Sequence, residues 1–326
     1  MSPGCLPRIS LAILPVREDE HQPLYKVARS GLRPDTGWSI ILPMTPNETR
    51  AALERLALQP SKAMGQNFLV DRNIAYLIVD AASLHDDDTV LEIGPGLGAL
   101  TELLLEHVAR VVAVEKDGRL CEFLRERFGH RQKLQLVHSD ALEFDFAPVA
   151  PFKVVANLPY SVATPLLQRF VDSPARPQRM VLTVQREVAD RLTAKPRTKD
   201  YGALTLFTQL YYEVRREHII SPRCFIPPPA VESAVVSLRL APHPLLEPDL
   251  EAPFKDLVRA GFGQRRKMLR GVLPKLATSV SVTAEKLEVA LKPLGILPTA
   301  RGEELSLAQW LLLTRSLVSP TLAERE

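Results

Sequence analysis

Residues 90–98 constrain the fold of this chain more than any other stretch, because they read V-L-E-I-G-P-G-L-G. Val90, Leu91 and Ile93 are typical of a buried strand, and three glycines spaced two apart follow directly. Glycine lets the backbone turn sharply and approach a ligand, since no Cβ is in the way. Residues 99–107 then continue at helical spacing. A strand, a glycine turn and a helix N-terminus predict a cradle for a nucleotide-type ligand, although the glycines alone also fit a purely structural turn.

Two acidic residues follow the next predicted strands, where such a ligand needs them. Glu115 ends the predicted strand 110–114 and stands 21 positions after Gly94. In a βαβ unit this spacing places a carboxylate at the tip of the neighbouring strand, where it can bind both hydroxyls of a ribose. Asp140 follows the predicted strand 134–137, and an acid there can reach an adenine amino group. Because one acid at a strand end is common by chance, this prediction depends on the acids and the glycines together.

The predicted strand 153–156 ends in Asn157, Leu158, Pro159 and Tyr160. An exocyclic aromatic amine is a poor nucleophile, because its lone pair is delocalised into the ring. The Asn157 side-chain oxygen and the Leu158 carbonyl could accept the two hydrogens of such an amine. Pro159 has no N–H and leaves the region rich in acceptors, while Tyr160 offers a face on which a base can stack. A β-turn built on Asn and Pro is the alternative, but the carboxyl end of a strand favours a ligand site.

The remaining elements extend this pattern. Helices and strands alternate after the N-L-P-Y motif as far as the predicted strand 212–219. A proline-rich entry at 225–229 leads into a final strand without an intervening helix, which predicts a terminal antiparallel hairpin on a parallel sheet. Residues 61–71 precede a helix that Asp71 is expected to cap, and they fit either an ordinary capped loop or a flap over the glycine cradle.

Composition excludes several classes of protein. The chain is 46% hydrophobic and 24% charged, which is normal for a soluble globular protein. No apolar run approaches the ~18 residues that a membrane span requires. Its three cysteines lie far apart without a C-x-x-C pair, and its seven histidines have no metal-ligand spacing. We therefore expect a cytoplasmic protein with no membrane partner and no bound metal.

Proline content divides the chain into predicted domains. Six prolines break every apolar run in residues 1–43, so we expect a disordered N-terminal extension there. We hypothesise that folding begins near Met44, and that the natural start codon lies there. A proline-rich stretch at 241–253 marks the end of a first domain over residues 44–241. The helical pattern beyond it predicts a small second domain over residues 242–318, followed by a tail at 319–326.

Basic residues gather in two places. The loop 194–200 carries Lys195, Arg197 and Lys199. Residues 254–273, where the pattern is helical, carry five cations with no acid between the first and the last, namely Arg259, Arg265, Arg266, Lys267 and Arg270. A run of charge is usually a solvated face, but cations without a counter-charge favour phosphate binding.

Taken in order, the motifs resemble those of the ribosomal RNA adenine N6-dimethyltransferases. The motifs are G-Q-N-F-L-x-D, L-E-I-G-P-G-x-G-x-L-T, V-E-x-D, D-A-L, N-L-P-Y and F-x-P-P-P-x-V-x-S-A-V, and the resemblance runs from about Met44 to Leu317. It implies an α/β fold, a Rossmann-like class I S-adenosylmethionine-dependent methyltransferase domain, followed by a small all-helical domain. Residues 262–270 and 297–307 resemble the small-subunit branch, whereas Gly271 and residues 161–163 depart from the usual pattern.

The resemblance implies a role for each matching residue. S-adenosylmethionine would be the methyl donor, and the residues expected to bind it are Asn67, Leu69, Gly94, Gly96, Glu115, Asp140, Ala141 and Asn157. The catalytic motif would be Asn157, Leu158, Pro159 and Tyr160, with Tyr160 stacked on a target adenine that leaves its stack at a cost of about a few kcal/mol. The residues expected to bind RNA are Lys195, Arg197, Lys199, Arg265, Arg266, Lys267 and Arg270.

The expected reaction is N6,N6-dimethylation of two adjacent adenosines in the 3′-terminal hairpin of small-subunit ribosomal RNA, linked to biogenesis of that subunit. It requires no metal and no covalent intermediate. The expected partner is this RNA within a pre-ribosomal particle, and we expect a monomer. Three alternatives stay open. They are a large-subunit methylase of the antibiotic-resistance type, a DNA adenine methylase with the same pocket, and a non-catalytic ribosome-assembly or RNA-binding module.

Overall fold

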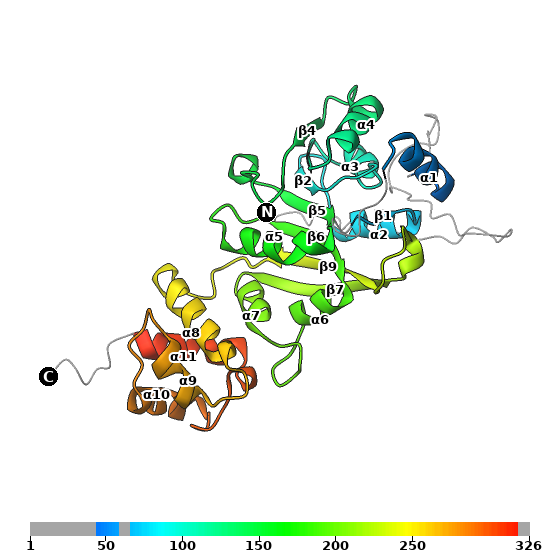
Figure 1. The fold of residues 1–326 in the computed structure, drawn as a ribbon. Coiled ribbons are helices and arrows are strands. Elements are labelled where there is room, and N and C mark those ends of the chain that lie inside the picture. The colour runs from blue at the N-terminus through cyan, green and yellow to red at the C-terminus, as the bar shows by residue number, and fades with distance from the viewer. Residues whose placement is uncertain (1–43, 59–65, 319–326) are drawn as a thin grey trace, which may run out of the picture. The chain divides into compact units, whose positions relative to one another are not determined.

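The computed structural model describes residues 44–58 and 66–318 (Figure 1). The predicted extension at 1–43, the predicted tail at 319–326 and residues 61–65 of the possible flap lie outside the described residues. In the part that is described, no helix combines the length and the hydrophobicity that a membrane span requires.

A mostly parallel sheet of seven strands is the centre of the fold, with the order β4-β3-β2-β5-β6-β9-β7 (Figure 1). Its strands are β2 (Thr89–Ile93), β3 (Arg110–Glu115), β4 (Leu134–His138), β5 (Lys153–Asn157), β6 (Arg179–Gln185), β7 (Tyr212–Ile220) and β9 (Ser233–Leu240). Strand β9 runs antiparallel to both of its neighbours, β6 and β7, and the other pairs are parallel. The predicted antiparallel hairpin is therefore confirmed, and β9 lies between β6 and β7.

Seven α-helices of the described chain precede or connect these strands, and side chains cap the starts of α1, α2 and α4. Their bounds are α1 (Pro46–Arg55), α2 (Arg72–Ala81), α3 (Thr101–His107), α4 (Gly118–Phe128), α5 (Tyr160–Asp172), α6 (Arg186–Leu192) and α7 (Ala203–Gln209). Asp71 caps α2 as predicted, because its side chain accepts hydrogen bonds from the N–H groups of Asn73 and Ile74. Thr45 and Glu48 form a capping box at the start of α1.

The two faces of the sheet pack into two hydrophobic clusters. Val90 and Val111 pack with α2, α3 and α4, whereas Leu91 and Val112 pack with α5, α6 and α7. Successive strand side chains point to opposite faces, so a central strand such as β2 must be apolar on both. This burial fixes β2 in the middle of the sheet and places the glycine turn at its carboxyl end.

A second, two-stranded sheet joins segments that are distant in the sequence. Strand β1 (Phe68–Leu69) pairs antiparallel with β8 (Phe225–Ile226). Val70 extends the pairing, because its N–H donates to the Cys224 carbonyl at 2.9 Å. The pairing brings the G-Q-N-F-L motif against the start of the F-x-P-P-P motif.

Beyond β9 the described chain contains helices, turns and one isolated bridge, but no strand. Its α-helices are α8 (Glu251–Gly263), α9 (Leu269–Leu276), α10 (Ala284–Leu291) and α11 (Leu307–Val318). The expected helical run over residues 254–273 is wrong at residues 264–268, where the chain leaves helix between α8 and α9. The division into two domains at residue 241 stays a prediction, since hydrophobic residues of the helical part and of the sheet belong to one cluster.

Trp310 organises the helical part. Its side chain is fully buried, and its Nε1–H donates to the Gly302 carbonyl at 3.2 Å. The ring packs so closely on α8 that a Cβ on Gly261 would lie 2.6 Å from it. The indole therefore fixes α8, α11 and the turn at Gly302 against one another.

We predict that Trp310→Ala lowers the free energy of unfolding by about 3–5 kcal/mol, because it leaves a cavity and removes a buried hydrogen bond. Chemical denaturation measures this loss. The matched control is Leu312→Ala on the same helix, whose side chain is exposed and whose loss should be at most about 1 kcal/mol. Equal losses in the two variants would contradict the packing described above.

Candidate active site

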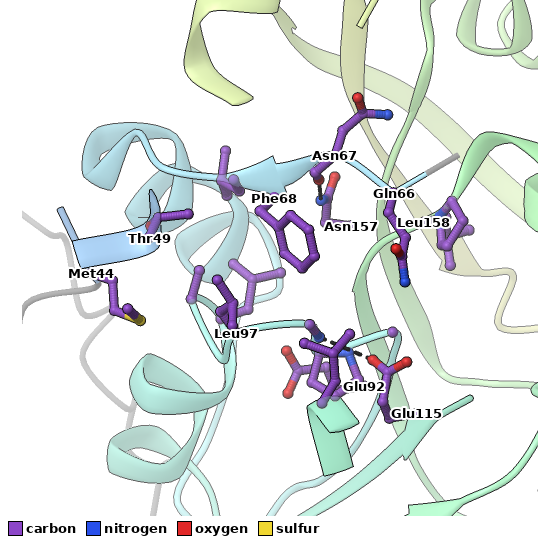
Figure 2. A pocket seen from close by; sticks show the side chains of 18 of the residues that line it. Met44, Thr49, Gln66, Asn67, Phe68, Glu92, Leu97, Glu115, Asn157 and Leu158 are labelled. Atoms are coloured by element: carbon purple, nitrogen blue, oxygen red, sulfur yellow. Dashed lines mark hydrogen bonds between the residues drawn. The ribbon is translucent and has the colours of Figure 1, made fainter. Parts of the chain in front are cut away.

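A pocket lies at the carboxyl ends of β2, β3 and β5 (Figure 2). Most of its lining comes from residues 66–69, the glycine turn and following residues after β2, and residues 157–160 after β5, and it is completed by Met44, Thr49, Glu92 and Leu120. Glu115 at the end of β3 also lines it. In open parallel sheets this edge is where ligands bind, so the topology and the lining indicate the same site.

The glycine turn adopts a backbone that other residues resist. Gly94, Gly96 and Gly98 have φ angles of +63°, +59° and +85°. A Cβ on Gly96 would lie 3.2 Å from the Phe68 ring, and one on Gly98 would lie 2.4 Å from Phe128. The sharp turn predicted from the sequence is therefore present, and the absence of side chains leaves a backbone wall on this side of the pocket.

Glu115 ties the glycine turn to the end of β3. One carboxylate oxygen accepts the Gly96 N–H at 3.1 Å, and the other accepts the N–H groups of Lys116 at 2.9 Å and Asp117 at 3.0 Å. Burial raises the pKa of this carboxyl, while the three N–H groups act in the opposite direction. Glu115 is 5% exposed and lines the pocket.

Asp140 and Ala141 follow β4, the neighbour of β3, and do not line this pocket. The Asp140 carboxylate accepts the Leu142 N–H at 2.8 Å and the Lys116 ammonium at 2.7 Å. The hydrogen bond from Lys116 is the main reason that the pKa of Asp140 lies below its ordinary value. Ser139 donates its N–H to the Glu115 carbonyl at 2.9 Å, so the Asp140 turn lies beside the end of β3.

Residues 157–160 join several parts of the site. The Asn157 side-chain nitrogen donates to the Asn67 carbonyl at 2.9 Å, which assigns the side-chain oxygen as an acceptor. Leu158 donates its N–H to Thr183 of β6 at 3.2 Å. Pro159 packs against Gly94, since a Cβ on that glycine would lie 3.6 Å from the proline ring. The acceptors predicted from the sequence therefore sit next to the glycine turn.

Tyr160 begins α5 and is anchored through its hydroxyl. The distance from its Oη to the Ser233 Oγ is 2.6 Å, and Ser233 is buried at the start of β9. Sequence reasoning placed Tyr160 in the site but missed Ser233, whose role depends on a contact 73 positions along the chain. Stacking of a target base on Tyr160 stays a prediction.

Glu92 is a pocket residue that sequence reasoning missed. It lies within β2, lines the pocket and is 1% exposed. Burial raises its pKa to about 8, and the nearby charge of Glu115 adds to the rise. Figure 2 shows the two carboxyls together on one side of the pocket. The sequence feature that could have identified Glu92 is an acidic residue between the apolar residues of a predicted buried strand.

Two side-chain oxygens lining the pocket have no hydrogen-bond partner in the described structure, Gln66 Oε1 and Glu92 Oε2. Buried polar atoms are normally paired, because an unpaired one loses its hydration without compensation. Both residues line the pocket, and Glu92 also interacts with Thr101.

The predicted RNA-binding cations fall into two groups. Arg265 forms an ion pair with Glu303 and donates to the carbonyls of Thr198 at 2.7 Å and Lys199 at 2.6 Å. Arg197 lies 3.6 Å from a carboxylate oxygen of Glu304. The others are exposed and have no ion pair with another described residue: Lys195, Lys199, Arg266, Lys267 and Arg270.

No three His, Cys, Asp or Glu side chains come together as a metal site within the described ranges. The expectation that the chain binds no metal stays a prediction.

Comparison with known proteins gives consistent matches. A family model described as ribosomal RNA adenine dimethylase matches residues 58–318. A ribosomal RNA small subunit methyltransferase A of Geobacter metallireducens is 43% identical over 268 residues, covering 80% of this chain and 97% of the relative. Its namesake in Geobacillus thermodenitrificans is 40% identical over 282 residues, covering 84% and 96%.

Solved structures match the fold as well. A dimethyladenosine transferase from Plasmodium falciparum has a TM-score of 0.67 at 25% identity, covering 76% of this chain and 95% of that one. The 23S rRNA methyltransferase ErmE has a TM-score of 0.64 at 29% identity, covering 78% and 100%. The expected Rossmann-like methyltransferase fold is confirmed by these similarities together with the mostly parallel sheet.

The raised pKa of Glu92 predicts a pH dependence of stability. The carboxyl titrates near its ordinary value of 4.5 when unfolded and near 8 when folded, so folding favours the protonated form. Compared with Glu92→Gln, which stays neutral, the wild type should lose about 1 kcal/mol of unfolding free energy per pH unit between about pH 5 and about pH 8. Urea titrations across this range measure the difference.

The control for this prediction is Glu122→Gln on an exposed position of α4, which should show no such trend relative to the wild type. A difference between wild type and Glu92→Gln that stays constant with pH would contradict a protonated, buried Glu92.

Proposed function

Because the chain belongs to the ribosomal RNA adenine dimethylase family, we propose that it dimethylates N6 of two adjacent adenosines in the 3′-terminal hairpin of small-subunit ribosomal RNA. The observation that carries this proposal is the position of the Asn157 and Leu158 acceptors beside the glycine turn. Relatives named for the small subunit support the choice of RNA. The similarity to ErmE makes large-subunit RNA the alternative that a test must address.

The residues of the pocket fit S-adenosylmethionine. Glu115 presents a carboxylate to accept ribose hydroxyls, and the glycine backbone leaves room for a ligand to approach. Asn67, Leu69, Gly94, Gly96 and Asn157 also line the pocket, where Gln66 and Glu92 present side-chain oxygens without a hydrogen-bond partner among the described residues. Asp140 and Ala141 would hold the adenine beyond the end of β3. When bound, this cofactor supplies a methyl group on a positively charged sulfur.

The chain itself would position the target amine. The Asn157 side-chain oxygen and the Leu158 carbonyl would accept its two hydrogens and hold its lone pair toward the cofactor side of the pocket. Pro159 keeps hydrogen-bond donors away from these acceptors. Tyr160, fixed by Ser233, would stack on the extruded adenine. Most of the rate enhancement would then come from positioning rather than from proton transfer.

We also propose that the substrate is RNA within a pre-ribosomal particle, and that the protein acts as a monomer in the cytoplasm without a metal. The exposed cations Lys195, Lys199, Arg266, Lys267 and Arg270 support an extended contact with phosphates. Arg265 and Arg197 would stabilise this surface, because Arg265 forms an ion pair with Glu303 and Arg197 with Glu304.

The test of the proposal is methyl transfer from labelled S-adenosylmethionine to under-methylated small ribosomal subunits, with large subunits and DNA as parallel acceptors. Label in two adjacent small-subunit adenines, chased to the dimethyl form, is the expected result. Label confined to large-subunit RNA would favour the resistance-type activity. Cofactor binding without transfer to any acceptor would favour an assembly or RNA-binding module.

We predict that Asn157→Ala lowers the rate of methyl transfer by about 100-fold or more, since it removes an acceptor aimed at the reacting amine. Binding of RNA should be largely retained, and filter binding checks this separately. Asn47→Ala, at an exposed position of α1, is the matched control and should keep full activity. Near-normal turnover of Asn157→Ala would refute the assigned role.

The two groups of cations should respond differently to mutation. Lys267→Ala should weaken RNA binding and reduce the slope of log Kd against log salt by about 1, as expected for one lost phosphate contact. Arg265→Gln should weaken binding with an accompanying loss of thermal stability, because it releases the carbonyls of Thr198 and Lys199. The control is Lys292→Ala, an exposed cation outside the predicted set. Unchanged binding in Lys267→Ala would contradict this surface.

A further inference from the structure

Helix α5 extends from the N-L-P-Y motif to the turn that carries Asp140. It begins at Tyr160, directly after Pro159, and carries Arg169 near its other end. Arg169 reaches across to the segment after β4, where one guanidinium nitrogen donates to the Ala141 carbonyl at 2.7 Å and another to the Phe144 carbonyl at 3.1 Å. Arg169 belongs to none of the motifs identified in the sequence.

The segment that Arg169 holds is a compact turn. The Asp140 carbonyl accepts the N–H groups of Glu143 at 3.0 Å and Phe144 at 2.9 Å, and the Asp140 side chain accepts the N–H of Leu142 at 2.8 Å. These bonds close the turn internally. Lys116 and the Ser139 N–H attach its first residues to the end of β3. The two bonds from Arg169 attach residues 141–144 to α5.

The geometry of the arginine makes the attachment rigid. A guanidinium holds its N–H donors in one plane, so two carbonyls bound to it keep a fixed separation. The group also lies over the Phe146 ring, with 5.1 Å from Cζ to the ring centroid. Helix α5 is itself fixed, because Leu166, Leu167 and Phe170 are buried against the sheet. A displacement of the Asp140 turn would therefore break both hydrogen bonds.

We infer that Arg169 is a positioning residue for cofactor binding. It holds the Asp140 turn in the position where that turn would bind the adenine, and it connects the turn to α5, the helix that begins at the N-L-P-Y motif. The inference rests on the proposed function, in which Asp140 binds the adenine amino group. Arg169 touches neither the cofactor nor the RNA in this account.

The test compares Arg169→Gln and Arg169→Lys with the wild type. Binding of S-adenosylhomocysteine and of adenosine is measured by calorimetry, and exchange of the amides in residues 139–146 is followed by mass spectrometry. Arg169→Gln should raise both dissociation constants by about tenfold, the equivalent of one charged hydrogen bond. Amide exchange in this segment should be faster in the free variant and should slow when S-adenosylhomocysteine saturates it. Arg169→Lys, which keeps the charge but not the planar fork, should fall between the two.

Steady-state kinetics separate positioning from catalysis. In Arg169→Gln, KM for S-adenosylmethionine should rise while kcat at saturating cofactor stays within about twofold, because bound cofactor restores the turn. The matched control is Arg176→Gln. Arg176 also donates to a backbone carbonyl, that of Val171, and lies over an aromatic ring, that of Tyr211, but it does not contact the Asp140 turn. Its loss should affect thermal stability without changing cofactor affinity.

Asp140→Ala, which removes the acceptor, distinguishes failure of the inference from failure of the proposed function. If Asp140→Ala weakens adenosine binding and Arg169→Gln does not, the positioning role is overturned and the function stands. If Arg169→Gln lowers only the melting temperature, as Arg176→Gln is expected to do, Arg169 is merely structural and the inference is again overturned. If Asp140→Ala itself leaves adenosine binding unchanged, the assignment of Asp140 fails and the inference fails with it.

Discussion

The site depends on the hydrogen bonds that the Glu115 carboxylate accepts. It accepts N–H groups from the glycine turn after β2 and from the two residues that follow β3. One side chain therefore fixes the ends of two neighbouring strands and the start of α4. Glu92 lies close enough for the charge of Glu115 to raise its pKa. With two carboxyls buried together, keeping Glu92 protonated avoids placing a second negative charge in the pocket.

The order of motifs along the chain has a structural explanation. The G-Q-N-F-L motif forms β1, which pairs with β8 at the start of the F-x-P-P-P motif. The N-L-P-Y motif contacts both segments, through the bond from Asn157 to Asn67 and the bond between Tyr160 and Ser233. Three motifs that are far apart in the sequence are thus held together, and two of them line the pocket. Substitution in any of them would be expected to disturb the position of the others.

The sequence was sufficient to predict features that depend only on neighbouring residues. The period of the strands, the Asp71 cap and the glycine turn depend on neighbouring residues, and the structure agrees with each of them. The sequence was insufficient to predict contacts between residues that are far apart along the chain. The sequence did not reveal that Arg265 pairs with Glu303, 38 positions away, and the binding of Arg265 to RNA stays a prediction. The insertion of β9 between β6 and β7, and the attachment of the Asp140 turn by Arg169, depend on tertiary contacts in the same way.

We propose that the pocket at the ends of β2, β3 and β5 binds S-adenosylmethionine in the orientation set by Glu115 and Asp140. A crystal structure of the protein with S-adenosylhomocysteine tests it most directly. We expect both ribose hydroxyls on the Glu115 carboxylate, the adenine amino group on Asp140, and the sulfur facing the Asn157 side chain. A ligand bound with its adenine beside Asn157, or bound away from Glu115, would contradict the account.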